Sequence, residues 1–454
     1  MAVTAPLPVL TLEQQEAART PSPPALKGTA TSADRAKGVG VSATLAANEA
    51  LDERRRRGER VLPMAFGEAG VPVARILRNA LATASHLAGY GPVAGSAELR
   101  TAAAGYWARR GLPTDPSEVV CGPGSKALLY GLLLSLQAGD VAIPRPSWVS
   151  YAAQASLTGV RPVYVPILPG EGGVPDPGLL SAAAISARRE GRRIGAVIVT
   201  MPDNPTGTLA AADTVRQLCS VARQHDLLIV SDEIYRDLAY EGTSFLSPAD
   251  VAPERTVITS GLSKNLALGG WRLGVARLPG DSPAIAALRD RLLATCSEIW
   301  SAPAAPVQRA AALAFSEPPE IVERVARSRQ LHAAIARAVA ARFTAAGAHV
   351  PPPRGAFYLY PDFAAHRATL TRSGVETSAD LAGLLLRGHG VGVLPGSAFG
   401  DPERALRLRV ATSQLYGEAE WQREAALAAD DPAELPWIAD SLAWLDQALT
   451  AITA

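Results

Sequence analysis

Four clusters of polar residues each follow a short apolar segment, and together they contain the residue types needed to bind an anion and to form an imine. The clusters are Gly122-Pro-Gly-Ser-Lys126, Pro202-Asp-Asn-Pro-Thr-Gly207, Asp232-Glu-Ile-Tyr235 and Ser260-Gly-Leu-Ser-Lys264. In an open parallel sheet, ligands bind outside the carboxyl ends of the strands. Any one cluster could be an ordinary turn, but four of them at four strand ends predict a binding site on one rim of a sheet.

The segment from Gly122 to Lys126 has the composition of an anion-binding turn. Its glycines let a ligand approach the backbone, and a helix beginning near Ser125 offers free amides and a favourable dipole. The spacing is not that of a Walker A loop, and a simple strand-to-helix turn has the same pattern. Arg272, further along the chain, could add a permanent charge for a phosphate.

Asp232 and Lys264 are placed for charge pairing and for covalent chemistry. Asp232 comes just after the apolar run Leu227–Val230, where a carboxylate is costly without a partner. It is therefore a helix cap, half of a buried ion pair or the partner of a cationic ring nitrogen. Lys264 follows another apolar segment. Partly apolar surroundings lower the pKa of a lysine and suit imine formation, although most lysines are simply solvated.

The elements that must position these clusters alternate between strands and helices. The strand-like runs are Glu118–Cys121, Asp140–Ile143, Arg161–Val165, Ala196–Thr200, Leu227–Ser231 and Thr256–Thr259. Helical patterns lie between several of them, as in Ser125–Gln137 and Ala210–His225. Strand, helix and strand in series predict an α/β fold with a mostly parallel sheet covered on both faces.

We predict four regions along the chain. They are a flexible N-terminal arm over residues 1–35, an N-terminal helix contributing to the small domain over 36–65, a large domain over 66–305 and a C-terminal small domain over 306–454. The arm is rich in Ala, Pro, Thr and Ser and has little periodicity. The small domain is indicated by long helices interrupted by the strand-like Gly355–Tyr360 and Ala405–Val410. The insertion-like stretch Gly417–Pro436 either packs on the small domain or shapes an interface.

Composition excludes several classes of protein. The 454 residues carry 44 Lys and Arg against 43 Asp and Glu, a net charge of +1 that offers no footprint for nucleic acid or an anionic membrane. The longest uncharged apolar stretch, Ala127–Gly139, is shorter than the about 20 residues that span a bilayer. The three cysteines are far apart and the six histidines fall in no motif, so we expect no disulfide and no metal. No export signal is visible, so we expect a cytoplasmic protein.

The order and spacing of several motifs resemble the signature of class I/II aminotransferases. These are aspartate-aminotransferase-like enzymes of fold type I that use pyridoxal 5′-phosphate (PLP). The motifs are Asn204-Pro-Thr-Gly207, Ser231-Asp-Glu-Ile-Tyr235, Ser263-Lys264, Gly270-Trp-Arg-Leu-Gly274, Tyr90-Gly-Pro-Val-Ala-Gly95, Pro146-Ser-Trp-Val-Ser-Tyr151, Gly355-Ala-Phe-Tyr358 and Arg407-Leu-Arg-Val-Ala-Thr-Ser413. The resemblance implies a large domain with a mostly parallel seven-stranded sheet flanked by helices, and a smaller α+β domain.

The resemblance also implies which side chains surround the PLP ring. Lys264 would carry PLP as a Schiff base and then move a proton, and Asp232 would keep the pyridine nitrogen protonated. Asn204 and Tyr235 would bond the phenolic oxygen of the ring, and Trp148 would stack on its face.

The phosphate and the dimer interface follow from the same resemblance. One loop and one charged side chain would bind the phosphate, namely Gly124, Ser125, Lys126 and Arg272. A small hydroxyl residue common in relatives is replaced here by Gly261, so Ser260 and Ser263 are the substitutes considered. Tyr90 would reach the phosphate of a neighbouring subunit, which implies a homodimer.

For the substrate, the resemblance implies that Arg407 clamps the α-carboxylate in a bidentate fork. The Gly67 amide would lie behind it, and Trp148 and Asn204 would also contact the substrate. Arg409 stands where relatives usually have a small or polar residue, and it is assigned no role. The loop Gly67-Glu-Ala-Gly-Val71 differs from the Gly-Glu-Pro-Asp-Phe common in relatives, so an unusual side-chain preference is expected.

The implied activity is transfer of an amino group from an L-amino acid to a 2-oxo acid in a ping-pong reaction. An alternative is other PLP chemistry in the same fold, such as a carbon–sulfur lyase, decarboxylase, oxidase or cyclase. The cofactor site does not separate these, because reaction choice depends on which Cα bond aligns with the ring. Two further hypotheses are a PLP-sensing regulator, for which the roughly 40 leading residues offer no DNA-binding domain, and an inactive scaffold.

Overall fold

The computed structural model describes residues 43–136, 139–280 and 282–454. The predicted flexible arm over residues 1–35 lies outside these ranges. By their contacts, the described residues all belong to one compact unit. Within them, no helix is both long enough and apolar enough to cross a bilayer.

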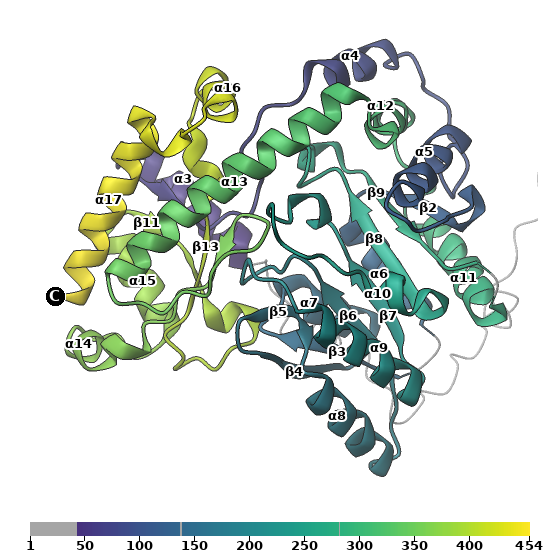
Figure 1. The fold of residues 1–454 in the computed structure, drawn as a ribbon, viewed down its shortest axis with the longest axis horizontal. Coiled ribbons are helices and arrows are strands. Elements are labelled where there is room, and N and C mark those ends of the chain that lie inside the picture. The colour runs from purple at the N-terminus through teal and green to yellow at the C-terminus, as the bar shows by residue number, and fades with distance from the viewer. Residues whose placement is uncertain (1–42, 137–138, 281) are drawn as a thin grey trace, which may run out of the picture. The chain divides into compact units, whose positions relative to one another are not determined.

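An eight-stranded mixed sheet forms the centre of the large core (Figure 1). Its strands, in spatial order, are β2 (Val119–Gly122), β9 (Gly274–Arg277), β8 (Thr256–Gly261), β7 (Leu228–Asp232), β6 (Ile194–Thr200), β3 (Asp140–Arg145), β4 (Pro162–Leu168) and β5 (Glu171–Pro175). From β8 across to β4 the neighbours run parallel, whereas β9 is antiparallel to β2 and β8, and β5 is antiparallel to β4.

The mostly parallel sheet is as predicted, but the predicted count of seven strands is one too low among the described residues. The segment Glu171–Pro175 contains two glycines and ends in proline, so its composition does not favour a strand. It forms β5 because the short turn after β4 folds it back onto that strand as an edge hairpin.

Alternate residues of the sheet face two separate groups of helices. In β6, Ala196 and Ile198 pack on one face, and Val197 and Val199 pack on the other. The first face is covered by α6 (Ser125–Ser135), α7 (Val149–Thr158) and α11 (Pro283–Ile299). The second is covered by α8 (Pro177–Arg189) and α9 (Ala212–His225), with α10 (Pro248–Val251) at its edge. Near β2 and β9, the second face is covered instead by α4 (Arg75–Thr83), α5 (Ala97–Ala108) and α12 (Ala305–Ser316).

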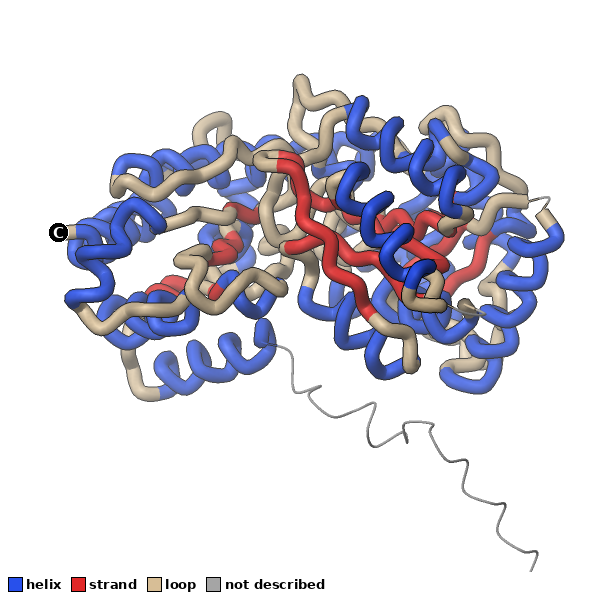
Figure 2. The backbone as a smooth tube through the Cα atoms, turned by 90° about the horizontal axis from the view of Figure 1, so that it is seen from below, coloured by secondary structure: helices blue, strands red, loops and turns tan. Residues whose placement is uncertain are grey.

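A further core contains most of the C-terminal residues and the segment after α3 (Ala43–Arg56). It holds two small sheets, β1 (Leu62–Pro63) beside β11 (Val391–Gly392), and β13 (Leu408–Ala411) between β10 (Tyr358–Leu359) and β12 (Leu394–Pro395). Its helices are α13 (Pro319–Ala345), α14 (Arg367–Arg372), α15 (Ser378–His389), α16 (Glu420–Ala428) and α17 (Pro436–Thr453). Figure 2 shows these short strands among the helices. The predicted domain boundaries stay a prediction.

The insertion-like stretch Gly417–Pro436 contains α16 and packs on α17. The rings of Trp421 and Trp437 meet edge to face, with centroids 5.4 Å apart. Trp437 also donates a hydrogen bond from its indole nitrogen to the Tyr416 carbonyl at 2.9 Å. The stretch was predicted either to pack on the small domain or to shape an interface. In the structure it packs on the C-terminal core.

Candidate active site

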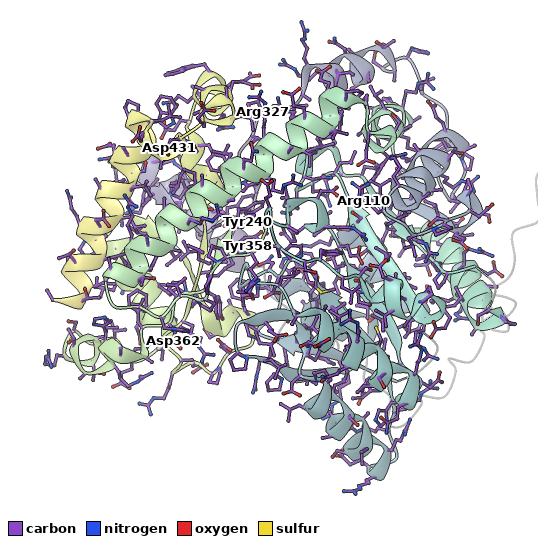
Figure 3. All side chains as sticks on the ribbon, viewed as in Figure 1. Arg110, Tyr240, Arg327, Tyr358, Asp362 and Asp431 are labelled. Atoms are coloured by element: carbon purple, nitrogen blue, oxygen red, sulfur yellow. The ribbon has the colours of Figure 1, made fainter. Side chains whose placement is uncertain are left out.

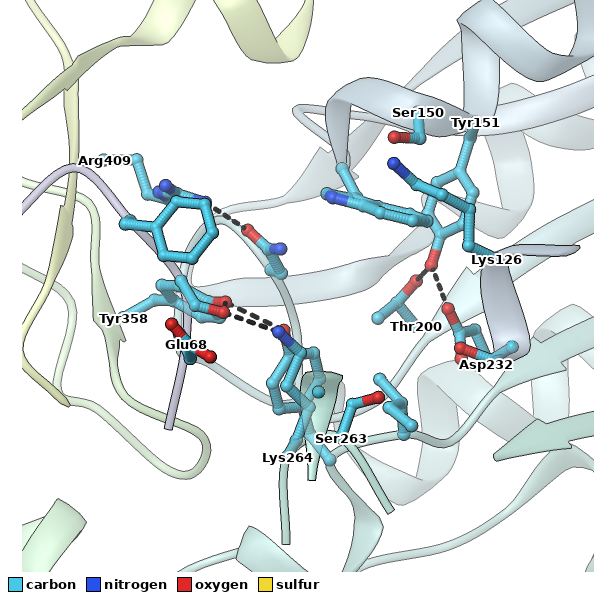
Figure 4. A pocket seen from close by; sticks show the side chains of 18 of the residues that line it. Glu68, Lys126, Ser150, Tyr151, Thr200, Asp232, Ser263, Lys264, Tyr358 and Arg409 are labelled. Atoms are coloured by element: carbon cyan, nitrogen blue, oxygen red, sulfur yellow. Dashed lines mark hydrogen bonds between the residues drawn. The ribbon is translucent and has the colours of Figure 1, made fainter. Parts of the chain in front are cut away.

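A cavity of about 320 Å³ lies where the polar clusters meet (Figure 4). Its walls come from the carboxyl ends of β6, β7 and β8, the first turns of α6 and α7, the loop after β1, and strands β10 and β13. The residues predicted from the sequence that line it are Gly67, Ser125, Lys126, Trp148, Asn204, Asp232, Tyr235, Ser263, Lys264 and Arg272. Parallel strands end on one rim, so segments far apart in the chain meet there.

One end of the cavity is built for an anion. Gly124 has a φ of +94°, and a Cβ at this position would lie 2.3 Å from Nη2 of Arg272. The glycine therefore lets the guanidinium approach the start of α6, where the first amides have no partner within the helix. Partial burial and the nearby charge of Arg272 lower the pKa of Lys126. Two cations beside free amides are suited to a phosphate group.

A buried carboxylate forms another part of the cavity wall. Strand register places Thr200, Asp232 and Thr259 side by side on β6, β7 and β8. Asp232 is 3% exposed, and its Oδ2 accepts a hydrogen bond from the Tyr151 hydroxyl at 2.8 Å. Burial raises the pKa of Asp232 to about 6, although hydrogen bonds from Tyr151 and Thr259 act to lower it. At neutral pH the carboxylate is thus ionised and can pair with a cationic ring nitrogen.

Tyr151 belongs to one of the sequence motifs, but the sequence predicts no role for it. In the structure its hydroxyl donates a hydrogen bond directly to Asp232. The phenol bridges Asp232 and Thr200, with its oxygen 2.5 Å from Thr200 Oγ1. A fully buried tyrosine beside a buried acid is not visible in the sequence, because the two residues are far apart in the chain.

We expect Tyr151→Phe to lower kcat/KM about tenfold or more, the loss typical of a hydrogen bond to a charged group. The Tyr151 hydrogen bond lowers the pKa of Asp232, so without it this pKa rises and the ionised form needs a higher pH. The acidic limb of the kcat/KM profile should therefore move to higher pH. Tyr240→Phe is the control, because Tyr240 is equally buried but donates to the Ala356 carbonyl at 3.0 Å. An unmoved limb in Tyr151→Phe would contradict the expectation.

In Figure 4, Lys264 lies between Asp232 on one side and Tyr358 and Arg409 on the other. Its Nζ donates a hydrogen bond to the Gly67 carbonyl at 2.5 Å. Burial, and next the charge of Arg409, lower the pKa of Lys264 to about 8. A sizeable fraction of the amine is therefore neutral near pH 7 to 8 and able to attack a carbonyl carbon.

Tyr235 meets a second tyrosine at the wall of the cavity. Its hydroxyl lies 2.8 Å from the Tyr358 hydroxyl, and both side chains are buried. The Tyr358 hydroxyl donates in turn to the Gly67 carbonyl at 3.4 Å. A Cβ at position 67 would lie 2.2 Å from the Tyr358 oxygen, so only glycine fits there. The pair of phenols gives the site a fixed donor beside the lysine.

The structure does not bring Arg407 to the cavity, contrary to the prediction. Its Nε donates to Asp362 Oδ2 at 2.8 Å, and its Nη1 donates to Asp401 Oδ2 at 3.2 Å. The side chain is 40% exposed. Figure 3 shows Asp362 apart from Tyr358 of the cavity wall. Two carboxylates already neutralise this guanidinium, which leaves it unsuited to clamp a substrate.

Arg409, to which the sequence assigned no role, occupies the cavity instead. It is 2% exposed, and its guanidinium lies 5.0 Å from the ring centroids of Tyr358 and Phe399. Nη1 donates to Asn204 Oδ1 at 3.4 Å and Nη2 donates to the Ala65 carbonyl. Nε is buried and has no hydrogen-bond partner among the residues that the structure describes. Among the described residues, no carboxylate pairs with it. A buried cation of this kind calls for an anionic ligand.

The remaining predicted residues lie outside the cavity lining. Ser260 is buried within β8, so only Ser263 of the two hydroxyl substitutes faces the site. Tyr90 is 97% exposed and does not line the cavity of its own chain. Its reach into a neighbouring subunit stays a prediction.

The chain matches a family model described as aminotransferase class I and II over residues 63–416. The aspartate aminotransferase of Geobacillus stearothermophilus is 35% identical over 389 residues, which are 84% of this chain and 94% of that protein. A probable aspartate/prephenate aminotransferase of Thermus aquaticus is 34% identical over 370 residues, which are 80% of this chain and 91% of that protein.

The architecture is also similar to that of a solved relative. The aspartate aminotransferase of Thermus thermophilus, solved with maleate, has a TM-score of 0.75 and 30% sequence identity, covering 89% of this chain and 98% of that chain. The expected fold class, fold type I with a large sheet domain and a small domain, is therefore confirmed.

Proposed function

The chain belongs to the class I and II aminotransferases, and from that premise we propose a role for each side chain of the cavity. The enzyme transfers an amino group from an amino acid to a 2-oxo acid, and PLP is its cofactor. When bound, PLP supplies an electron-accepting ring that stabilises negative charge at the substrate Cα. The observation that supports the proposal best is a partly neutral lysine and a buried, ionised aspartate on one cavity.

The residues of the cavity fit PLP at each of its polar groups. The amides at the start of α6, with Arg272 and Lys126, would hold the phosphate. Asp232 would hold the ring nitrogen, and Trp148 would cover a ring face. The cavity volume of about 320 Å³ suits a ligand of this size. In the part of the chain that the structure describes, neither Asp232 nor Arg272 forms a salt bridge, which supports the assignment.

Lys264 would attach the cofactor covalently and then act as the base. Its amine would take the proton from the substrate Cα and pass it on to the cofactor. A pKa of about 8 leaves part of this amine neutral near pH 7, and the neutral amine can accept a proton. With PLP bound, the Tyr235 hydroxyl would donate to the phenolic oxygen and accept the hydrogen of Tyr358, which would then no longer donate to Gly67. Asn204 would contact the same oxygen and the substrate carboxylate.

Arg409, rather than Arg407, would bind the α-carboxylate of the substrate. A guanidinium can hold a carboxylate with two parallel hydrogen bonds. Arg409 is buried, lines the cavity and lacks a carboxylate partner among the described residues, whereas Arg407 already holds Asp362 and Asp401. Arg407 and Arg409 are two residues apart, so in an extended strand both side chains point to the same face. The carboxylate-binding role would therefore belong to the arginine two residues later than the predicted one.

A panel of amino donors against pyruvate, 2-oxoglutarate and oxaloacetate tests the proposed function. L-Aspartate comes first, because the relatives carry its name. We expect equal amounts of the new 2-oxo acid and the new amino acid, without ammonia or hydrogen peroxide. Release of ammonia or peroxide in amounts equal to the 2-oxo acid would instead indicate a lyase or an oxidase, which the comparisons do not favour.

We propose a homodimer in which Tyr90 completes the site of the partner, and a cytoplasmic location. The exposure of Tyr90 and the free, buried thiols of the three cysteines support these two proposals. Tyr90→Ala and Lys264→Ala subunits, mixed and reassociated, should regain activity that neither has alone. The reason is that one site of each hybrid dimer then contains both intact residues. No gain on mixing, with hybrids verified by mass, would contradict the role of Tyr90.

A further inference from the structure

A second cavity, of about 150 Å³, adjoins the segment that carries Lys264. It is lined by apolar residues of α12 and α13 and by a polar cluster composed of Tyr106, Arg110, Asp237, Asn265 and Glu317. The proposed function uses none of these five residues. Arg110, which follows α5, is labelled in Figure 3.

Asp237 is the centre of this polar cluster. Its Oδ2 accepts hydrogen bonds from the Tyr106 hydroxyl at 3.0 Å and from Asn265 Nδ2 at 2.9 Å. Its Oδ1 accepts from Arg110 Nη2 at 2.8 Å and Nε at 3.2 Å. The carboxylate, 11% exposed, therefore has all four of its acceptor sites in use. Such a carboxylate holds its partners in fixed directions.

The partners of Asp237 belong to segments that meet the catalytic rim. Asp237 lies two residues after Tyr235, in the turn that follows β7. Asn265 is the residue directly after Lys264, in the segment that follows β8. The hydrogen bond between them joins the chain segment of the tyrosine to that of the lysine. Arg110 anchors this link to α5 and α12, because it also pairs with Glu317 at 2.6 Å.

Stability alone does not explain the amide at position 265. Asn265 is 8% exposed, its Oδ1 is buried, and within residues 43–136, 139–280 and 282–454 that oxygen has no hydrogen-bond partner. Burying an unpaired carbonyl oxygen costs free energy, and this cost opposes the stabilisation from the hydrogen bond of Asn265 to Asp237. The amide at this position therefore adds little net stability and suits a positioning role.

We propose that Asp237 and Asn265 are positioning residues, whose hydrogen bond holds Lys264 and Tyr235 at a fixed spacing in the active site. The inference rests on the roles proposed above for Lys264 and Tyr235. Neither Asp237 nor Asn265 lines the larger cavity, so both act through their chain neighbours. A small shift of either segment would misplace the amine relative to the phenol that faces the same ligand.

Asn265→Leu tests the proposal, because it removes the hydrogen bond and the unpaired oxygen while keeping the volume. We expect the unfolding temperature of the PLP-free protein to change little, because loss of the hydrogen bond to Asp237 and removal of the unpaired oxygen have opposite effects. Uptake of PLP by the PLP-free protein should slow about tenfold, the loss expected for a buried hydrogen bond to a charged group. In the PLP-loaded protein, the midpoint of the pH titration of the visible absorbance should move to higher pH. Tyr235, as a donor to the phenolic oxygen, favours the deprotonated form of the linkage between Lys264 and PLP, and a misplaced Tyr235 would favour it less.

Glu317→Gln is the matched control, since it weakens the cluster at Arg110 and leaves the Asp237–Asn265 hydrogen bond in place. It should lower the unfolding temperature and leave uptake and titration unchanged. If Asn265→Leu keeps the uptake rate and the titration midpoint of the wild type, the proposal is wrong. That result differs from failure of the proposed function, in which the wild type itself would not take up PLP on Lys264.

Discussion

Lys264→Ala is expected to lower the transamination rate by about 10⁴-fold, the upper range for loss of a positioned general base, and also to remove the covalent attachment of PLP. Both losses arise because the Lys264 amine would serve two purposes in the reaction. Treatment with borohydride followed by peptide mass analysis should find PLP on Lys264 in the wild type and on no residue of the variant. The rate of PLP uptake by the wild type should rise with pH and level off above about 8, because only the neutral amine attacks.

Lys126→Ala is the matched control for this experiment, because Lys126 is the other lysine on the cavity wall. Its loss should weaken PLP binding through the phosphate while leaving the borohydride product on Lys264. Reduction of PLP onto Lys126 in the Lys264→Ala variant, with activity retained, would show that the reactive amine has been assigned to the wrong residue.

Arg409→Met is expected to lower kcat/KM for all amino donors by about 10²- to 10³-fold, the loss typical when one partner of a buried charge pair is removed. Arg407→Met, at a half-exposed ion pair, should change kcat/KM only a few-fold, because such pairs contribute about 0–1 kcal/mol. Steady-state kinetics of both variants, with the visible spectrum of bound PLP as a check on the cofactor, compares them directly.

Stability gives a second and opposite readout for the same pair. Without substrate, Arg409 is a buried charge with no carboxylate partner among the described residues, so Arg409→Met should raise the unfolding temperature of the ligand-free enzyme. Arg407→Met should lower it slightly, because Asp362 and Asp401 lose their common partner. The reverse order of the two variants in kcat/KM would restore Arg407 as the carboxylate-binding residue.

Much of this site could be predicted from the sequence, because strand ends mark where ligands bind. Asp232 and Lys264 each follow an apolar run in a repeated pattern, and the structure brings both to one cavity. Arg407 and Arg409 could not be separated in this way. They have the same chemistry, lie two residues apart and share a face, and only the positions of Asp362 and Asp401 in the folded chain distinguish them.

Tyr151, β5 and Asn265 were missed for related reasons. The contact of Tyr151 with Asp232 depends on the register of β6, β7 and β8, which no local pattern contains. Strand β5 has glycines where β-branched residues are expected, and only pairing with β4 makes it a strand. Asn265 looks like an ordinary loop residue until its amide is found beside Asp237.

The guanidinium of Arg409 lies on β13 and the amine of Lys264 lies in the loop after β8, so two distant segments of the chain contribute to one cavity. Recognition and reactivity are thus encoded in separate stretches of the gene. Because Arg409 would bind the carboxylate that all amino acids share, a chimera that exchanges only this stretch with a relative should keep both the chemistry of the host and its preference among donors.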